Sequence, residues 1–226
     1  SIRRPLTVED RSLRPSASIG VAIYPENGER PGELLQNADA AMYEAKRTGR
    51  ATYRFHDPEM NQTARSRLAL QDDVRRGIHT GQFELHWQPI VAAGSLELVR
   101  AEALLRWNRE GTLVSPGEFL PLVENSPIAG ELGQWVARTT AQSVGALHTQ
   151  LPAGFSVSIN VAPSEMMENR FVQRLVEDLG EREDSIGRVH VEITESAAIH
   201  DIETAKEVLA GLRAAGIPVH LDDFGG

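Results

Sequence analysis

The stretch that decides the fold is Val-His-Val-Glu-Ile-Thr at residues 189–194. Its apolar and polar residues alternate, as they do in Ser-Val-Ser-Ile-Asn-Val at 156–161 and in Val-His-Leu-Asp at 219–222. Because successive side chains of a strand point to opposite faces, each stretch is predicted to be a strand with one apolar and one polar face. The apolar faces should pack against helices. The polar faces should line a site, because unpartnered polar groups are costly to bury.

Helical patterns separate these strands along the chain. We expect helices near 116–124, 129–149, 163–179 and 201–215, and strands near 155–161, 188–194 and 217–222. Such alternation is typical of a parallel sheet covered by helices. Upstream, Phe83 to Val91 and Leu96 to Trp107 are predicted to be neighbouring strands joined across the Ala93-Gly94 turn.

The first quarter of the chain has a different organisation. A strand is predicted at 16–24, a helix at 33–47 and a short strand at Tyr53 and Phe55, and an amphipathic helix should follow at 64–80. We place the domain boundaries so that 1–58 form a first domain, 59–81 a connecting helix and 82–226 a second domain.

Four oxygen-bearing side chains are predicted at the ends of strands: Glu102, Asn160, Glu192 and Asp222. The last three are spaced by 32 and 30 residues, which suits one strand, one crossover helix and a return loop. Barrels with this repeat carry their chemistry at the carboxyl ends of their strands. Oxygen donors suit Mg²⁺ or Mn²⁺, and Asp223 could reach a second ion. A two-ion site favours phosphodiester hydrolysis.

Composition excludes several classes of protein. The chain has 226 residues, 41% of them hydrophobic and 24% charged, with a net charge of −9. That charge argues against binding to a nucleic-acid polymer or an anionic membrane. Cysteine is absent, so thiolate metal sites and disulfides are excluded, which fits a reducing compartment. No apolar run is long enough to span a bilayer, and no signal peptide is visible, so we expect this segment to be cytoplasmic.

Three residues near the acids have two interpretations each. His190 and His220 lie two residues before acids and share their face, so they could form a zinc pair. We favour hydrogen-bonded fillers of an inner layer, because a ligand should sit at the rim. Trp107 could stack on a base or pack in a core.

Five motifs carry a family resemblance. They are Gln-Pro-Ile at 88–90, Glu-Ala-Leu-Leu-Arg-Trp at 102–107, Ser-Ile-Asn-Val at 158–161, Glu-Ile-Thr-Glu at 192–195 and Asp-Asp-Phe-Gly at 222–225. Their order and spacing resemble those of EAL domains, which are cyclic diguanylate phosphodiesterases, over residues 64–226. The segment before them, with Ser-Ile-Gly-Val-Ala at 18–22 and Ala-Asp-Ala-Ala-Met-Tyr at 38–43, resembles the C-terminal end of a GGDEF domain.

The resemblance implies a fold and a set of roles. The fold is α/β, a TIM-like (β/α) barrel that is incomplete in this chain and follows an α+β fragment of a GGDEF domain. The metal ligands would be Glu102, Asn160, Glu192, Asp222 and Asp223, of which Glu102, Asp222 and Asp223 are also catalytic. Glu195 would hold the loop after the aspartate pair. Gln88 would contact a guanine edge, Arg106 a phosphate through its planar guanidinium, and Leu104 the substrate.

The implied function is hydrolysis of cyclic di-GMP to the linear dinucleotide pGpG with two Mg²⁺ or Mn²⁺ ions. The family's later lysine and glutamate lie beyond Gly226, so the chain is expected to be a piece of a longer protein and inactive alone. The full protein is expected to form a homodimer through its EAL domain and could be membrane-tethered upstream. Two alternatives stay open: a non-catalytic sensor of the same dinucleotide or of a partner protein, and an unrelated barrel enzyme acting on a sugar phosphate.

Overall fold

The computed structural model describes residues 6–8, 11–13, 15–49, 51–124, 126–147, 149–152, 154–180, 186–194 and 202–222. The chain forms two compact units, Ser1–Ala69 and Leu70–Gly226. The domain boundaries proposed from the sequence stay a prediction.

Unit 1 is a small α+β fragment. Strands β1 (Leu6–Val8) and β2 (Arg11–Leu13) pair antiparallel, and β3 (Ile19–Val21) pairs parallel with β4 (Tyr53–Phe55). Helix α1 (Pro31–Arg47) connects β3 to β4. It begins with proline at its first position, where no amide donor is needed, and the Glu33 carboxylate accepts from the backbone of Arg30 over 3.2 Å. The strand predicted at 16–24 is present as β3 but is shorter than predicted.

Helix α2 (Pro58–His79) begins before the amphipathic helix predicted at 64–80 and starts one residue before the connecting helix placed at 59–81. Residues 58–63 are mostly polar, so the apolar periodicity did not reveal them. The structure explains the early start, because proline suits the first helical position and the Asp57 carboxylate accepts from the Glu59 amide over 2.9 Å. Within the sequence, α2 begins in unit 1 and ends in unit 2.

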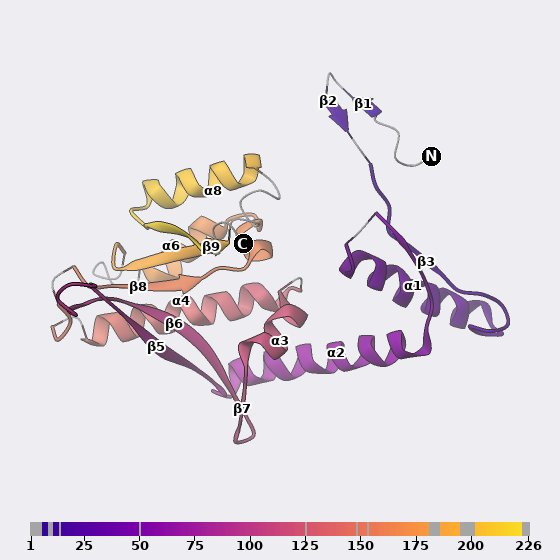
Figure 1. Cartoon of the computed structure of the whole chain (residues 1–226), viewed down its shortest axis with the longest axis horizontal. Helices are drawn as coiled ribbons and strands as arrows, with labels where there is room; N and C mark the ends of the chain where they lie inside the picture. The colour runs from indigo at the N-terminus through magenta and orange to yellow at the C-terminus, as the bar shows by residue number, and fades with distance from the viewer. Residues whose placement is uncertain are drawn as a thin grey trace. The chain divides into compact units, whose positions relative to one another are not determined.

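Unit 2 is built on a six-stranded sheet with the order β10-β9-β8-β6-β5, to which β7 adds beside β6 (Figure 1). Its strands are β5 (Phe83–Val91), β6 (Leu98–Arg109), β7 (Thr112–Val114), β8 (Ser156–Asn160), β9 (Val189–Thr194) and β10 (Val219–Asp222). The strands β6, β8, β9 and β10 are parallel, as predicted, and β5 pairs antiparallel with β6. Strand β7 was not predicted.

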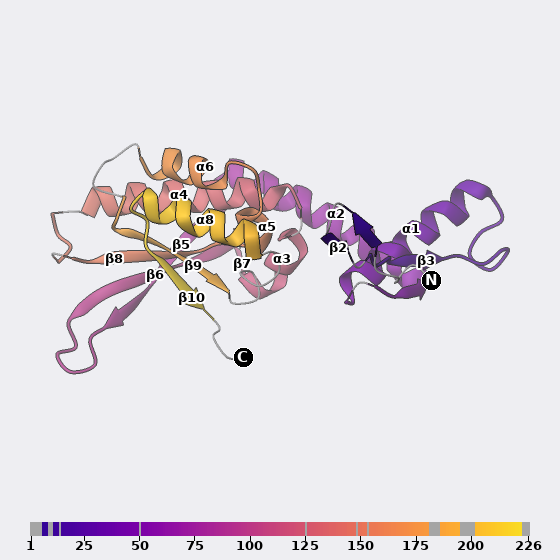
Figure 2. The same ribbon diagram turned by 90° about the horizontal axis from the view of Figure 1, so that it is seen from above.

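Helices α4, α6 and α8 lie on one side of the parallel strands (Figure 2). The helices of unit 2 are α3 (Pro116–Val123), α4 (Ile128–Leu147), α5 (Pro163–Met166), α6 (Phe171–Leu179) and α8 (Ile202–Ala214). The single helix predicted at 163–179 is wrong. Arg170 has a φ of 70°, a left-handed conformation that an α-helix cannot contain, so the segment divides into α5 and α6.

The main core of unit 2 fills the space between these helices and the sheet. Its strand residues are those of the predicted apolar faces, including Val157, Ile159, Val191 and Ile193, and Leu212 of α8 packs with them. A second core lies around Trp107, with Val74, Phe83, Phe119 and Leu132 among its members. Trp107 is fully buried there, which decides between its two interpretations in favour of core packing.

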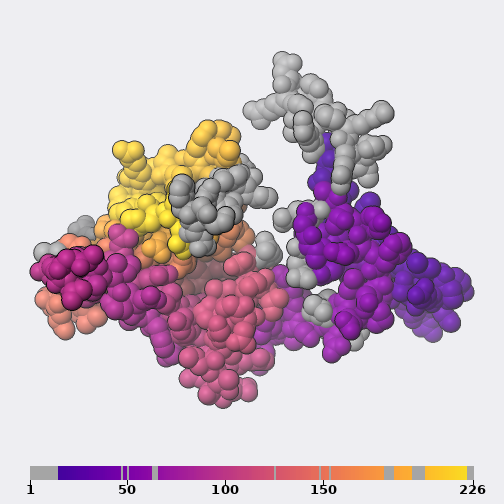
Figure 3. Space-filling view, viewed as in Figure 1, coloured from indigo at the N-terminus to yellow at the C-terminus, as the bar shows by residue number. Residues whose placement is uncertain are grey.

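The β5–β6 hairpin extends beyond the parallel strands. Its turn, which includes the predicted Ala93-Gly94 pair, reaches the surface of the unit in Figure 3, and Leu96 beside it is 73% exposed. The hairpin connection was correctly predicted from this turn.

Candidate active site

The polar face of the sheet carries the predicted site. In β9, Val189, Val191 and Ile193 are buried, whereas the alternating His190 and Glu192 are half-buried. The difference follows from strand geometry, since the two sets project from opposite faces. The site residues therefore lie on the face away from α4, α6 and α8.

Glu102 and Asn160 meet on this face. The Asn160 side-chain amide donates a hydrogen bond of 2.8 Å to Oε1 of Glu102. Glu102 does not end its strand, because β6 runs on to Arg109, so the expectation of a strand end is wrong for this residue. What ends near Glu102 is the pairing of β6 with β8, whose last pair is Ala103 with Ile159.

The backbone register steps from one strand to the next. Glu102 is level with Ser158, two residues before Asn160, whereas Asn160 is level with Glu192. Glu192 is level with His220, two residues before Asp222. Strands of a barrel are tilted against its axis, so donors at one height occupy shifted register positions. The four oxygen donors thus follow the rim of a tilted sheet.

A cavity of about 350 Å³ opens beside these donors. It is lined by five of the predicted site residues, which are Leu104, Arg106, Asn160, Glu192 and Asp222. Glu102 is hydrogen-bonded to Asn160, which is one of the lining residues. The structure therefore brings together side chains that lie more than a hundred residues apart in the sequence.

The predicted ligand contacts Gln88 and Arg106 lie on the same hairpin as Glu102. Gln88 pairs directly with Glu102 across β5 and β6, so their side chains share a face. Arg106 lies four residues after Glu102 in β6, so the two side chains project from the same face of the strand. The Arg106 guanidinium donates to the Leu105 carbonyl oxygen over 2.8 Å. That bond uses one of the five N–H groups of an arginine, so the side chain can still bind an anion.

Glu165 also lines the cavity and was not identified from the sequence. It lies on α5, and burial raises its pKa to about 8, with Glu168 acting in the same direction and Arg174 opposing it. A Cβ atom at Gly133 would lie 2.1 Å from Oε1 of Glu165, so the carboxyl group packs directly against the α4 backbone. Its place just after the end of β8 was the available signal, because barrel sites use the loops that follow strands.

The two histidines form a pair within the sheet. Nδ1 of His190 lies 2.9 Å from Nε2 of His220, with ring centroids 5.0 Å apart. At that centroid separation the two nitrogens face each other nearly head-on, which is the geometry of a hydrogen bond and not of a shared metal ion. Burial lowers the pKa of His190 to about 4, helped by Arg100 and His220, so its ring is neutral at pH 7.

Two predicted site residues, Glu195 and Asp223, lie outside the described residues. Within the described ranges, no three side chains of the types His, Cys, Asp and Glu lie close enough together to form a metal-binding group. Asn160 is an amide and stands outside that count. The donors present are all oxygens, which is the chemistry that hard divalent cations require.

Comparison with known protein families shows which family the chain belongs to. Residues 71–226 match the EAL domain family. The chain belongs to the EAL domain family. Residues 1–52 match the GGDEF domain family, described as diguanylate cyclase, so the EAL domain is preceded by a piece of a second domain.

Curated relatives align with nearly the whole chain. Over 99% of its length the chain is 34% identical to the bifunctional diguanylate cyclase/cyclic di-GMP phosphodiesterase MucR of Pseudomonas aeruginosa. It is 31% identical to the cyclic di-GMP phosphodiesterase PdeR of Escherichia coli, also over 99% of its length. It covers 33% of MucR and 34% of PdeR, so it spans about a third of the length of these relatives.

Solved EAL structures have the same fold. The PaMucR phosphodiesterase in complex with c-di-GMP superposes with a TM-score of 0.65 at 28% identity, covering 70% of this chain and 64% of that one. The EAL enzyme Bd1971, bound to cAMP and cyclic-di-GMP, gives a TM-score of 0.68 at 26% identity, covering 88% and 52%. The predicted fold class, a TIM-like barrel of which this EAL chain holds a part, is confirmed.

In the part of the chain that the structure describes, every helix is too short or too polar to cross a bilayer.

Proposed function

We propose that this chain is part of a metal-dependent phosphodiesterase that hydrolyses cyclic di-GMP to linear pGpG. The observation that carries the proposal is the convergence of Glu102, Asn160, Glu192 and Asp222 beside one cavity that also holds Arg106, in a chain of the EAL family. The names of the relatives and the cyclic di-GMP complexes of similar structures support the same substrate.

The oxygen donors fit Mg²⁺ or Mn²⁺. Asn160 offers an amide oxygen, and Glu102, Glu192 and Asp222 offer carboxylates, a set without sulfur or imidazole. With Asp223 as a further donor, these residues would hold two ions. Bound divalent ions lower the pKa of an attacking water and neutralise charge that develops on the phosphate oxygens.

The chain's own residues would bind and orient the substrate. Arg106 would pair with phosphate oxygens through two parallel N–H groups, and Gln88 would hydrogen-bond a guanine edge. Leu104 lines the cavity and would contact the substrate through its apolar side chain. Glu195 would hold the loop that carries Asp223. Positioning of this kind lowers the entropic part of the activation barrier, because the reacting groups are already held in place.

The decisive experiment uses the full-length protein that contains this chain. It is incubated with cyclic di-GMP and Mg²⁺ or Mn²⁺, and the products are separated by chromatography. We expect linear pGpG from the native protein and none from Glu102→Ala or Asp222→Asn. The matched control is Glu97→Gln, which removes an exposed acid from the hairpin away from the cavity. Binding of cyclic di-GMP without any product, at every metal concentration, would favour the sensor alternative.

We also propose that this segment is cytoplasmic and that the full-length protein forms a homodimer through its EAL domain. The absence of cysteine fits a reducing compartment. Light scattering of the purified protein measures its mass directly, and a monomer at micromolar concentration would contradict the dimer.

A further inference from the structure

The carboxyl end of β6 leaves the parallel sheet before it reaches Arg106. Pairing of β6 with β8 covers only Arg100 to Ala103. Beyond that point β6 is held by β5, in the pair Glu84 with Arg106, and by β7, in the pair Trp107 with Val114. The position of Arg106 relative to Asn160 is therefore not fixed by direct hydrogen bonding between their strands.

Helix α2 supports this end of β6 from behind. Trp107 projects from the face opposite to Arg106, is fully buried, and stacks on Phe83 with ring centroids 5.5 Å apart. Its Nε1 donates to the Gln82 side chain over 3.1 Å. A Cβ atom at Gly77 of α2 would lie 3.0 Å from Nε1 of Trp107, so the helix passes very close to the strand.

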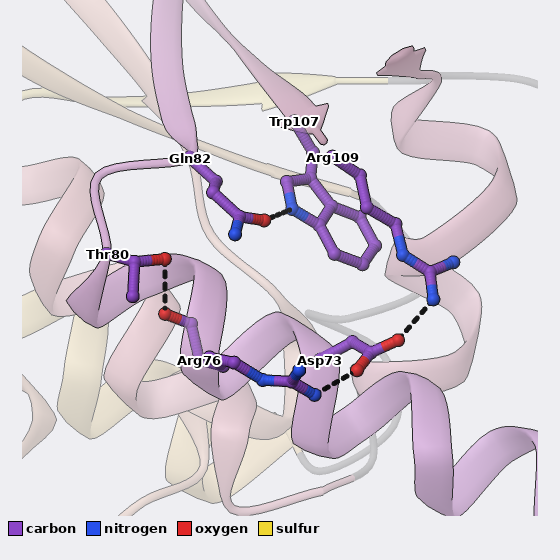
Figure 4. Close-up of polar contacts among 6 residues, drawn as sticks. All are labelled: Asp73, Arg76, Thr80, Gln82, Trp107 and Arg109. Atoms are coloured by element: carbon purple, nitrogen blue, oxygen red, sulfur yellow. Dashed lines mark hydrogen bonds and ion pairs between the residues drawn. The ribbon is translucent and has the colours of Figure 1, made fainter. Parts of the chain in front are cut away.

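One ion pair ties α2 to the end of β6 at the surface of this core. The Asp73 carboxylate accepts from the guanidinium groups of both Arg76 and Arg109, and Arg109 also lies 5.4 Å from the centroid of the Trp107 ring (Figure 4). Asp73 and Arg109 are 36 residues apart in the sequence. Asp73 and Arg76 are three apart within one helix, so that second contact fixes nothing beyond α2.

We propose that Asp73 and Arg109 are positioning residues for Arg106. Their ion pair holds the β5–β6–β7 ribbon against α2 and so sets the distance between the Arg106 guanidinium and the oxygen donors of the sheet. Neither residue lines the cavity, so any effect on the ligand must act through the strand. The inference rests on the proposed function, because Arg106 is the proposed phosphate contact.

The Asp73 side chain is 21% exposed and is shared by two guanidinium groups, unlike an isolated surface pair. Fully exposed pairs contribute little to stability, because water screens them and ordering two long side chains costs entropy. Here the backbone near Arg109 is already held by the Trp107 core, so the pair restrains a segment with little freedom left. A small interaction energy from the Asp73–Arg109 ion pair can then fix the orientation of this segment.

The first experiment needs no ligand. Hydrogen exchange of backbone amides 104–109 is compared in the full-length protein and its variants. We expect faster exchange in Asp73→Asn and Arg109→Gln, with Arg109→Lys restoring part of the protection. Arg76→Gln is the matched control, because it removes a partner of Asp73 without reaching β6. Unchanged exchange in both Asp73→Asn and Arg109→Gln overturns the proposal.

The second experiment measures cyclic di-GMP affinity by calorimetry in EDTA, so that no ligand turns over. We expect Asp73→Asn to weaken binding about fivefold in the native background and to have no further effect in an Arg106→Ala background, as coupled residues behave. An equal loss in both backgrounds would overturn the proposal, since Asp73 would then act independently of Arg106. If the native protein binds no cyclic di-GMP, the proposed function fails, and hydrogen exchange alone decides the role of the ion pair.

Discussion

The side-chain amide of Asn160 donates to Oε1 of Glu102 over 2.8 Å, between residues 58 apart in the sequence. This bond turns Nδ2 toward the carboxylate and leaves Oδ1 of Asn160 as an acceptor. An asparagine at this position can therefore donate to Glu102 and, in the proposed function, offer its side-chain oxygen to a cation.

The first prediction concerns that dual role. Asn160→Asp places a second carboxylate against Glu102, so like charges repel when no cation is bound. We expect a lower thermal midpoint in EDTA and a larger rise on adding Mg²⁺ than in the native protein, measured by tryptophan fluorescence. Asn108→Asp, an exposed substitution on β6, the strand that carries Glu102, is the control. Equal shifts for both variants would show that the local carboxylate pair has no effect.

The second prediction concerns metal binding by Asp222. Ligands that bind only the folded state stabilise it, by about 2.7 kcal/mol at a hundredfold excess over Kd. We expect Mn²⁺ to raise the thermal midpoint of the full-length protein. Asp222→Asn should lose most of that rise, because a neutral amide binds a divalent cation more weakly than a negatively charged carboxylate does. Calorimetric unfolding with and without Mn²⁺ checks this, and a rise that survives Asp222→Asn contradicts the assignment.

The third prediction follows from Glu165. Burial raises the pKa of this carboxyl group from 4.5 to about 8, so the folded state keeps a proton that the unfolded state has lost. The free energy of unfolding should therefore fall as pH rises from about 4.5 to about 8, and this contribution should not change further at higher pH. Glu165→Gln keeps the neutral shape and should remove this part of the pH dependence.

Denaturant unfolding between pH 5 and pH 9 provides the measurement for Glu165. The stabilisation by Glu165→Gln should be small near pH 5, grow as pH rises and level off above about pH 8. Glu177→Gln, an exposed residue on α6, should leave the pH dependence unchanged. A pH-independent effect of Glu165→Gln would mean that the carboxyl is charged in the folded protein.

The fourth prediction separates the two units. A Cβ atom at Gly20 would lie 1.8 Å from the backbone oxygen of Ala38, so Gly20→Ala forces β3 away from α1. We expect unit 1 to lose about 3 kcal/mol of stability. Gly32→Ala is the control, because a Cβ there meets nothing within 4 Å.

The two units can be followed separately because the three tryptophans lie at 87, 107 and 135, all in unit 2. Gly20→Ala should lower the first transition seen by circular dichroism and leave the tryptophan transition in place. A matching shift of the tryptophan signal would show that the units unfold together.

Several features were readable from local sequence alone. Alternation in residues 156–161 and 189–194 gave the strands and their two faces, and the apolar side of each strand does pack in the core. The spacing of Asn160, Glu192 and Asp222 indicated repeated strand–helix units. Such periodicity is a property of consecutive residues, so it needs no knowledge of tertiary contacts.

Other features had no local signal. The break at Arg170 depends on one backbone angle and was missed. Strand β7 has only three residues and takes its identity from pairing with β6. Short elements of this kind are defined by their partners.

The sequence by itself determined the fold class, the polar face and the oxygen chemistry of the donors, because these follow from residue type and period. Only the tertiary structure decided that Asn160 bonds Glu102, that Glu165 is buried beside Gly133, and that Asp73 reaches Arg109. The physical reason is that register, burial and long-range ion pairs depend on how distant segments pack, and that is a sum over the whole folded chain.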